Sequence, residues 1–450
     1  MVRSALRPAL LAAALFAPAL AHAGGYYYPD SGIVAFGRGG AWFASADSQF
    51  AQRYNPAGLV RVDRPTVNVG LSGVQQDVTF ARKDADGTTQ DPVSNEAKPF
   101  LVPQLGFAMP LPHDLAFAFG FYSPAAPGYA YDPNGAQRYT VIHTSIAQFS
   151  VGPSLAWRPL LWLAIGAGLQ WNALTVAEQL DVTTSGNTDP GGDVLVDLKA
   201  QDWFTVSGNL GLLIEPVPEL SIGFMVQPPS PYKGHGPATL DFTDWGAASV
   251  LDQTVWTDPN VDLTLSLPLR LGFGIAERPV DGLEIELAGT YERWSSLKSI
   301  QVQNIDITVT GAMGDTPVDS TIDLPAGFRD VYSVRLGGEY ALNDDWSVRA
   351  GGFWENGARK SDLISVALYD PNKFQASCGA SAMFFDHLRA DLSFGWLFIQ
   401  KMTVTDSQVT QTNAFGDTTT VVGNGDYSSH GWMVGGQLSW AFGKRKDGDG

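Results

Sequence analysis

The sequence is poor in cysteine, in charge and in long apolar runs, and each shortage excludes a class of protein. One cysteine, Cys378, in 450 residues excludes an internal disulfide, cysteine zinc clusters and CxxC redox chemistry. Beyond the N-terminus no run approaches the roughly 18 apolar residues of a spanning helix, so a helical membrane protein is excluded. Only 16% of residues are charged, and the formal charge of −18 argues against a nucleic-acid-binding protein, which needs a basic face.

Motifs of catalysis are also lacking. The chain has no GxSxG, HExxH or Walker A motif, and no GxGxxG followed by a helix. His143 with Ser145 is the one local candidate for a Ser-His pair of a barrel enzyme. The acidic residues of the first long loop lack the spacing of an EF-hand. We therefore expect no enzyme, no metal site and no cofactor.

The N-terminus has the three parts of an export signal. Arg3 and Arg7 form a basic region, residues 9–21 form an apolar region, and Ala21-His22-Ala23 fits the A-x-A cleavage pattern. The apolar stretch is too short to span a bilayer. The sequence predicts a signal peptide over residues 1–23, cleaved so that Gly24 begins the mature chain.

The rest of the chain alternates between apolar and polar residues with a period of two, which is typical of strands. In residues 331–340 one face carries Tyr332, Val334, Leu336, Gly338 and Tyr340. The opposite faces of such segments carry Glu284, Glu286, Arg335, Glu339, Arg349, Glu355, Arg389 and Asp391. A soluble sandwich would also alternate. Aromatic residues at the ends of the apolar faces, and charges suited to a wet lumen, favour a membrane barrel instead.

Loop lengths give the topology of this barrel. About fourteen strand segments lie between residues 65 and 443, joined alternately by tight Pro, Asp or Asn turns and by long polar loops. The long loops are placed near 83–98, 125–136, 185–194, 229–259, 309–327, 357–372 and 407–424. This pattern predicts an all-β fold, a transmembrane antiparallel barrel over residues 64–443, with short turns and both termini in the periplasm. Residues 444–450 are expected to be a disordered tail.

Residues 24–63 do not alternate and read as a separate unit. Asp47 and Ser48 are candidate N-caps for a short helix through Tyr54, and Asn55-Pro56 should end it, because a residue before proline is disfavoured in the α region. Forty apolar-rich residues are too few to fold alone. A fourteen-strand barrel is wider than its wall side chains can fill. We therefore predict that this segment is a plug, or hatch, inside the lumen.

A glycine-rich run, an Ala-Asp pair and Asn-Pro-Ala-Gly-Leu follow the signal peptide, and further strand motifs lie at 138–170, 266–279 and 324–354. Together these motifs resemble the FadL family of outer-membrane transporters for long-chain fatty acids and other hydrophobic compounds. The resemblance implies a fourteen-strand barrel with an N-terminal hatch. It also implies that Asn55, Pro56 and Ala57 tie the hatch to the wall and that hatch movement opens the path. In this family a kink in the third strand opens a lateral gap.

The expected function is passive uptake of long-chain fatty acids or related hydrophobic compounds across the cell outer membrane, with a hatch-gated lumen and a lateral exit. Arg270, Arg335 and Arg349 are candidates for binding a ligand carboxylate, or they pair with nearby acids such as Glu339 and Glu355. Phe100, Phe107, Phe121 and Tyr122 either line a ligand groove or face lipid. The alternative function is a general diffusion porin for small polar solutes. Expected partners are outer-membrane lipid, lipopolysaccharide and the barrel-assembly machinery, with no nucleic acid, for a monomeric protein.

Overall fold

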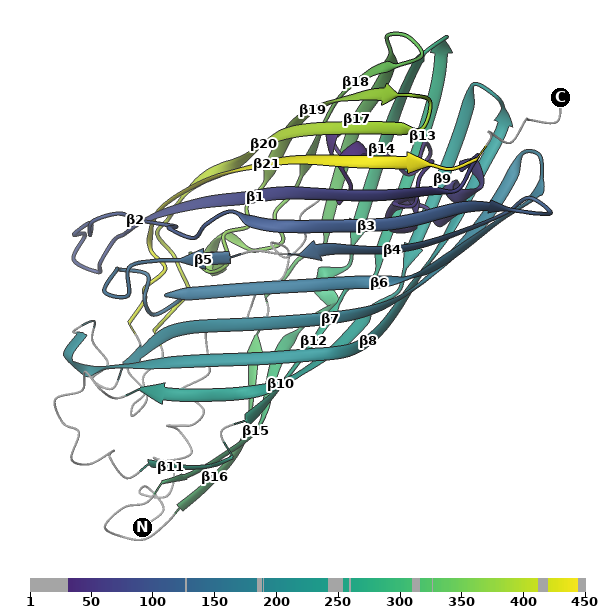
Figure 1. Cartoon of the computed structure of the whole chain (residues 1–450). Coiled ribbons are helices and arrows are strands. Elements are labelled where there is room, and N and C mark those ends of the chain that lie inside the picture. The colour runs from purple at the N-terminus through teal and green to yellow at the C-terminus, as the bar shows by residue number, and fades with distance from the viewer. Residues whose placement is uncertain are drawn as a thin grey trace.

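A computed structural model describes residues 31–125, 128–183, 188, 190–241, 254–258, 260–309, 316–325, 327–411 and 420–443. The predicted signal peptide, the first residues of the predicted hatch and the predicted C-terminal tail lie outside these ranges. No helix within them is long and apolar enough to cross a membrane. Most of the described chain is β-strand, drawn as a tilted barrel in Figure 1.

Fourteen antiparallel strands close into a ring, as the loop pattern predicted. Each strand pairs with the next, and β21 pairs with β1 along seventeen residue pairs, which removes every edge of the ring. In order, the ring strands are β1 (Thr66–Arg82), β3 (Phe100–Leu111), β4 (Leu115–Ala125), β6 (His143–Leu160), β7 (Leu163–Thr183), β8 (Asp193–Val217), β9 (Leu220–Gln227), β13 (Arg270–Val280), β14 (Leu283–Glu292), β17 (Val331–Ala341), β18 (Trp346–Glu355), β19 (Lys373–Phe384), β20 (Leu388–Val404) and β21 (Gly425–Ala441).

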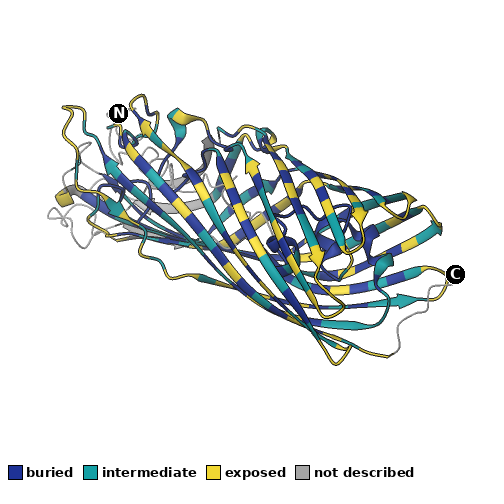
Figure 2. Ribbon diagram, turned by 90° about the horizontal axis from the view of Figure 1, so that it is seen from above, coloured by how far each residue is buried: buried dark blue, intermediate teal, exposed yellow. Residues whose placement is uncertain are grey.

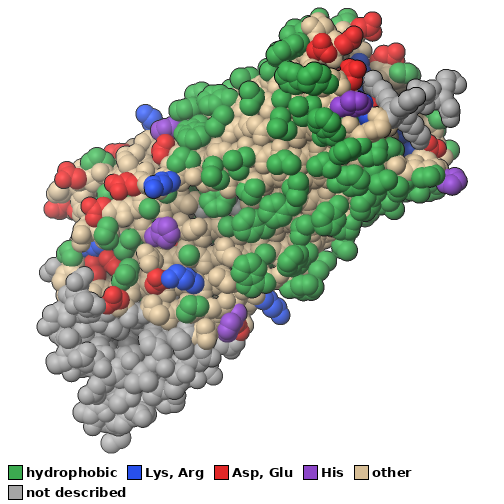
Figure 3. Space-filling model, viewed as in Figure 1, with side chains coloured by type: hydrophobic (Ala, Val, Ile, Leu, Met, Phe, Trp, Pro, Cys, Tyr) green, Lys and Arg blue, Asp and Glu red, His purple; other side chains and the backbone are tan. Residues whose placement is uncertain are grey.

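The outer surface of the ring is apolar, as the sequence alternation predicted. Burial switches from residue to residue along each strand, which gives the striped strands of Figure 2. Leu336 on β17 is 57% exposed, whereas its neighbour Arg335 is 2% exposed and points inward. Figure 3 shows apolar side chains over the middle of the wall and charged ones toward its ends. Exposed aromatic residues flank this band, for example Trp346 and Trp354 on β18.

The N-terminal segment, residues 31–63, lies inside the ring, and we call it the hatch segment. It contains α2 (Ile33–Gly37), α3 (Ala51–Tyr54) and the 3-10 helix η1 (Pro56–Arg61). The helix α3 ends where predicted, because Asn55 adopts an extended conformation (φ −157°, ψ 99°) before Pro56. The predicted capping was wrong. Phe50 occupies the N-cap position, and no side chain there accepts a backbone hydrogen bond.

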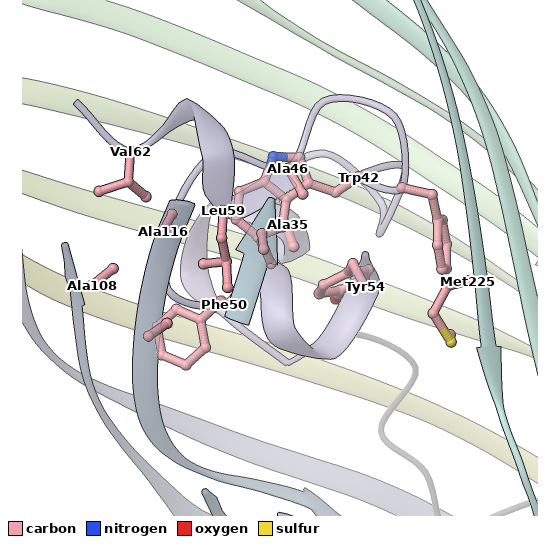
Figure 4. Packing of buried hydrophobic residues seen from close by; sticks show 14 of the residues in the cluster. Ala35, Trp42, Ala46, Phe50, Tyr54, Leu59, Val62, Ala108, Ala116 and Met225 are labelled. Atoms are coloured by element: carbon pink, nitrogen blue, oxygen red, sulfur yellow. The ribbon is translucent and has the colours of Figure 1, made fainter. Parts of the chain in front are cut away.

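The hatch segment and the inner wall share one hydrophobic core. Trp42, Phe50 and Tyr54 of the hatch segment pack among small wall residues, including Ala108 and Ala116 (Figure 4). The rings of Trp42 and Tyr54 meet edge to face, with centroids 5.6 Å apart. The segment therefore buries its large apolar side chains against the barrel, which explains how residues 31–63 hold a defined conformation.

Glycine on the inner wall permits this close approach. A β-carbon on Gly272 would lie 2.0 Å from the Phe43 ring, and one on Gly337 would lie 1.9 Å from the Arg38 carbonyl oxygen. Both distances are well below van der Waals contact. The Phe43 ring therefore packs directly on the wall backbone at Gly272, and the backbone of the hatch segment does so at Gly337.

On one side the wall continues past a belt of interruptions. Pro228 and Pro229 separate β9 from β10 (Ser230–Asp241), Pro268 and Leu269 separate β12 (Asn260–Leu267) from β13, and η3 (Trp294–Ser296) separates β14 from β15 (Ser299–Val309). Proline has no N–H to donate to a ladder. Beyond the belt, β10, β12 and β15 pair in turn, joined by β11 (Thr254–Asp258) and β16 (Thr316–Pro325). The predicted loops 229–259 and 309–327 are therefore partly strand.

The prediction of a polar loop at 357–372 was also wrong, because much of this segment is buried. After the 3-10 helix η4 (Ser361–Leu363), Ile364, Val366 and Tyr369 join a cluster inside the mouth of the barrel that faces the long loops. Tyr369 stacks on Tyr427 at 5.4 Å, and its hydroxyl donates to the Gln400 carbonyl oxygen at 2.5 Å. The lumen is thus packed at this mouth as well as around the hatch segment. The short strands β2 (Val93–Ser94) and β5 (Gly128–Ala130) lie at the same end.

Candidate functional site

A wall carboxylate, Glu286 on β14, holds one turn of the hatch segment. Its Oε1 accepts hydrogen bonds from the backbone N–H groups of Phe43 (2.6 Å) and Ala44 (3.0 Å). Its Oε2 accepts from the Ser45 N–H at 3.0 Å and from the Ser45 hydroxyl. Glu286 is fully buried. Alternation placed this side chain inside the barrel, but no sequence signal linked it to residues 43–45.

The predicted hatch residues lie against two neighbouring wall strands. Asn55 is fully buried, and its Nδ2 donates to the Phe43 carbonyl oxygen (2.8 Å) within the hatch segment and to the Leu212 carbonyl oxygen (3.0 Å) on β8. Its Oδ1 accepts from the Ala57 N–H at 3.1 Å. A β-carbon on Gly166 of β7 would lie 2.3 Å from the carbonyl carbon of Pro56. Asn55, Pro56 and Ala57 thus contact the wall.

Further polar contacts lie around the contacts made by Glu286 and Asn55. Arg61 pairs with Glu215 on β8 at 2.8 Å, and Arg38 pairs with Glu284 on β14 at 2.8 Å. On β20, the Ser393 hydroxyl donates to the Ile33 carbonyl oxygen at 2.8 Å. The hatch segment is therefore anchored on opposite sides of the ring, through both charged side chains and backbone groups.

Of the three candidate arginines, Arg349 is neutralised within the wall. Its Nε lies 2.7 Å from Glu339, and its Nη2 lies 2.8 Å from Asp391. Arg389 extends the network, with its Nε 3.0 Å from Asp391. Glu339, Arg389 and Asp391 also line a polar cavity of about 420 Å³ between the hatch segment and the short-turn end of the barrel. Arg349 therefore fits the interpretation as part of an ion-pair network.

Arg335 is committed to the hatch segment and the wall. Its Nη1 donates to the Gly39 carbonyl oxygen at 3.1 Å, and its Nε donates to the Ser333 hydroxyl at 3.0 Å. The guanidinium also lies 4.6 Å from the centroid of the Phe353 ring, and 3.8 Å from a Glu355 oxygen. This pattern suits a side chain that positions the hatch segment.

Arg270, the first residue of β13, keeps unused donors. It is 4% exposed, its Nε is 3.3 Å from a Glu292 carboxylate oxygen, and neither Nε nor Nη1 makes a hydrogen bond to the described residues. Arg53 of the hatch segment and Arg335 lie within electrostatic range of it. A buried guanidinium beside other cations binds an anion favourably, because the anion offsets the positive charge and accepts its hydrogen bonds. Arg53 was missed in the sequence, because nothing in the pattern around α3 placed it next to β13.

Strand pairing is interrupted along one seam, between β3 and β4, beside the hatch segment. The ladder between β3 and β4 ends at the pair Leu105 and Phe121, and β4 then shifts its register against β6 between Tyr122 and Ala125. Phe121 lies on the outer face, whereas Tyr122 is 5% exposed and belongs to the core of the hatch segment. Of the aromatic residues left unassigned by periodicity, Phe107 faces outward and Phe100 packs inward.

Fold and site together define a class. A closed fourteen-strand barrel with an apolar outer band, filled by an N-terminal segment anchored to the inner wall, is an outer-membrane transport barrel rather than an open pore. Known structures share this architecture. A Pseudomonas aeruginosa FadL homologue matches with a TM-score of 0.76 over 93% of this chain and 100% of that chain, at 16% identity. The Pseudomonas putida toluene transporter TodX matches with a TM-score of 0.69 over 95% and 100%, also at 16% identity.

The chain belongs to the outer membrane protein transport protein family (OMPP1/FadL/TodX), whose model matches residues 14–442. It is 21% identical over 394 residues to the long-chain fatty acid transport protein of Escherichia coli K12, covering 81% of this chain and 85% of that protein. A shorter match, 28% over 163 residues, spans 36% of this chain and 33% of outer membrane protein P1 of Haemophilus influenzae. The family comprises transporters and channels rather than enzymes, and this chain is an outer-membrane transporter of the FadL/TodX type.

Proposed function

We propose that this protein takes up long-chain fatty acids or related hydrophobic compounds passively across the outer membrane, and that Arg270 binds the carboxylate of an acidic ligand. The observation that carries the proposal is the buried Arg270 guanidinium, which has two nitrogen donors without hydrogen-bond acceptors among the described residues. The nearby Arg53 adds positive charge, and the core formed by Tyr54 and Tyr122 supplies apolar surface beside it. The fatty acid transport protein of E. coli is a relative over most of its length.

The route that we propose uses the hatch segment as the gate and the seam between β3 and β4 as the lateral exit. The seam starts at Leu105 and Phe121, within the apolar outer band, so a molecule leaving there would enter the membrane directly. Tyr122 and Phe50 share a core, which couples the edge of the seam to the hatch segment. A segment packed in the lumen argues against a porin that is always open to polar solutes.

Replacing Arg270 should separate acidic from neutral ligands. In Arg270→Gln, uptake of a long-chain fatty acid should fall about tenfold, because a hydrogen-bonded charge pair is worth about 1.5–3 kcal/mol. Uptake of a neutral alkane or aromatic hydrocarbon should change little. The measurement is accumulation of labelled ligand in cells without their own transporter, at equal outer-membrane abundance.

The matched control is Arg270→Lys, which keeps the charge and should retain most fatty acid uptake. Equal losses of fatty acid and hydrocarbon in Arg270→Gln would assign Arg270 to barrel structure and contradict the carboxylate site. Unchanged uptake of both ligands would contradict it as well.

Asn55→Ala should slow uptake of acidic and neutral ligands alike while the barrel stays folded. The change removes the bonds to Phe43 and Leu212, at a cost of about 1–3 kcal/mol for a buried partner left unpaired, which shifts a two-state hatch population roughly tenfold. The control is Asn172→Ala, a buried wall amide bonded to Thr205 and Ser207. Normal uptake by Asn55→Ala, together with normal uptake by a variant lacking residues 24–55, would show that the hatch segment is no gate.

A further inference from the structure

The outer wall carries an apolar hollow away from the seam between β3 and β4. It has a volume of about 650 Å³ and extends over β8, β9, β13, β14 and β17. Gly289 forms the floor of the hollow, because this outward position has no side chain. Its neighbours on the two adjacent strands are Phe273 and Val334. Leu271, Tyr291 and Tyr332 form the next row toward the long-loop end. The hollow therefore lies in the apolar band, just inside its aromatic border.

Two segments continue the wall directly beyond this row. Residues 293–298 follow β14, and residues 327–330 precede β17. They lie side by side, because the rings of Trp294 and Phe328 are 6.0 Å apart and Asp330 accepts hydrogen bonds from the Tyr291 hydroxyl (2.8 Å) and the Ser295 N–H (3.0 Å). The segments thus form a rim that is fixed to the aromatic row of the hollow.

The rim is cationic in a protein of net charge −18. Its two segments carry Arg293, Lys298 and Arg329, all exposed, and one acid, Asp330. Both Asp330 oxygens are engaged, one by Tyr291 and one by Ser295. Arg329 donates through Nε to the Gly357 carbonyl oxygen at 2.6 Å, which fixes the position of the guanidinium. The side chain is exposed, so its terminal nitrogens are accessible from outside.

The Asp330 carboxyl group is held in its charged form mainly by its hydrogen bonds. Desolvation acts to raise its pKa, but the hydrogen bonds from Ser295 and Tyr291 and the nearby Arg293 charge outweigh it, so the pKa lies below the usual range. The carboxylate is therefore charged at neutral pH and offsets one of three cations. The rim keeps a net positive charge directly above an apolar hollow.

We propose that the hollow and its rim bind one phosphorylated, acylated glycolipid of the outer leaflet, as found in lipopolysaccharide. An acyl chain lies over Gly289 between Phe273 and Val334, and the phosphate groups contact Arg293, Lys298 and Arg329. An acyl chain fills the apolar hollow at this depth and covers its exposed apolar side chains. Anionic head groups bind favourably to clustered Lys and Arg at the membrane surface. The site lies outside the lumen and does not depend on the transport function.

The test is titration of the purified full-length barrel in detergent with bisphosphorylated lipid A, followed by native mass spectrometry. Removing the rim in a triple variant, Arg293→Ala with Lys298→Ala and Arg329→Ala, should weaken binding by about fivefold for each cation. Filling the hollow with Gly289→Leu should also weaken it. Lipid A without its phosphates should bind the wild-type barrel as weakly as intact lipid A binds the triple variant.

Matched controls sit elsewhere on the same surface. Gly436→Leu changes an outward glycine of β21 whose β-carbon would lie 3.2 Å from the Leu392 side chain, whereas that of Gly289 would lie 3.2 Å from the Ser333 carbonyl oxygen. Lys83→Ala with Lys199→Ala removes two cations away from the rim, one half-buried and one exposed. Equal binding by Gly289→Leu and Gly436→Leu would overturn the proposal. So would a triple variant no weaker than the lysine control, or unchanged affinity for dephosphorylated lipid A. If Gly289→Leu fails to assemble, the charge variants and the dephosphorylated lipid decide.

Discussion

Glu286→Gln is expected to loosen the hatch segment at residues 43–45 and leave the barrel intact. The carboxylate accepts three backbone N–H groups and the Ser45 hydroxyl, whereas an amide has one acceptor oxygen and turns an NH2 group toward donors. Two donors lose their acceptor, at about 1–3 kcal/mol each, so the docked hatch segment should be destabilised by roughly 2–6 kcal/mol. Hydrogen exchange at the amides of residues 43–45 measures this directly.

The control for Glu286 is its neighbour Glu284, which faces the same lumen. Among the described residues, Glu284 bonds side chains alone, Arg38 at 2.8 Å and Arg278 at 2.5 Å. Glu284→Gln should therefore leave exchange at residues 43–45 nearly unchanged. Both variants should give the heat-resistant band of a folded barrel. Equal protection of residues 43–45 in Glu286→Gln and wild type would mean that other contacts hold the turn.

Leu336→Arg is expected to be the most damaging single change on the outer wall. Leu336 is 57% exposed at the middle of β17, where its cross-strand neighbours are Leu287 and Gly352. An arginine that faces lipid at this depth should cost about 2–4 kcal/mol. The measurement is the fraction of heat-resistant, folded barrel in the outer membrane, or the free energy of unfolding from lipid vesicles.

Two control variants test whether the added charge, and its place on the outward face, cause the loss of assembly. Leu336→Ala removes the same side chain without adding charge, and it should cost far less because lipid fills the space. Arg335→Leu, on the adjacent inward position, should leave barrel assembly nearly normal while it removes the bond to Gly39. If Leu336→Arg and Arg335→Leu reduced assembly equally, the two faces of β17 would be misassigned.

The sequence predicted the ring of strands because every ring strand has two different environments. One face contacts lipid, and the other faces a wet or packed lumen. That constraint repeats over residues 66–441 and leaves a period of two that can be counted. It does not apply beyond the belt at Pro228 and Pro268, where the wall has left the apolar band. The strands β10, β12, β15 and β16 therefore lay in segments that were read as loops or as parts of longer strands.

The site was predicted less completely, because contacts between distant segments leave no local pattern. Alternation placed Arg270, Arg335 and Arg349 inside the barrel but could not separate them. Only the structure distinguishes Arg349, bound to Glu339 and Asp391 with one nitrogen lacking a hydrogen bond, from Arg270, which faces one acid, Glu292, and has two such nitrogens among the described residues. The inward loop at 357–372 was missed for a related reason. Its apolar residues Ile364, Val366 and Leu368 do stand two apart, but they span only five residues between Gly357 and Pro371, which is too short a run to separate from a loop.

Packing of the lumen at both mouths has a consequence for the cell that carries this protein. The tyrosines around Tyr369 and Tyr427 pack inside one mouth, and the core around Trp42 and Phe50 fills the lumen nearer the other. Such a barrel should pass few ions, nutrients or antibiotics while no ligand is bound. A bacterium could then place many copies in its outer membrane and still keep that membrane an effective barrier to toxic solutes.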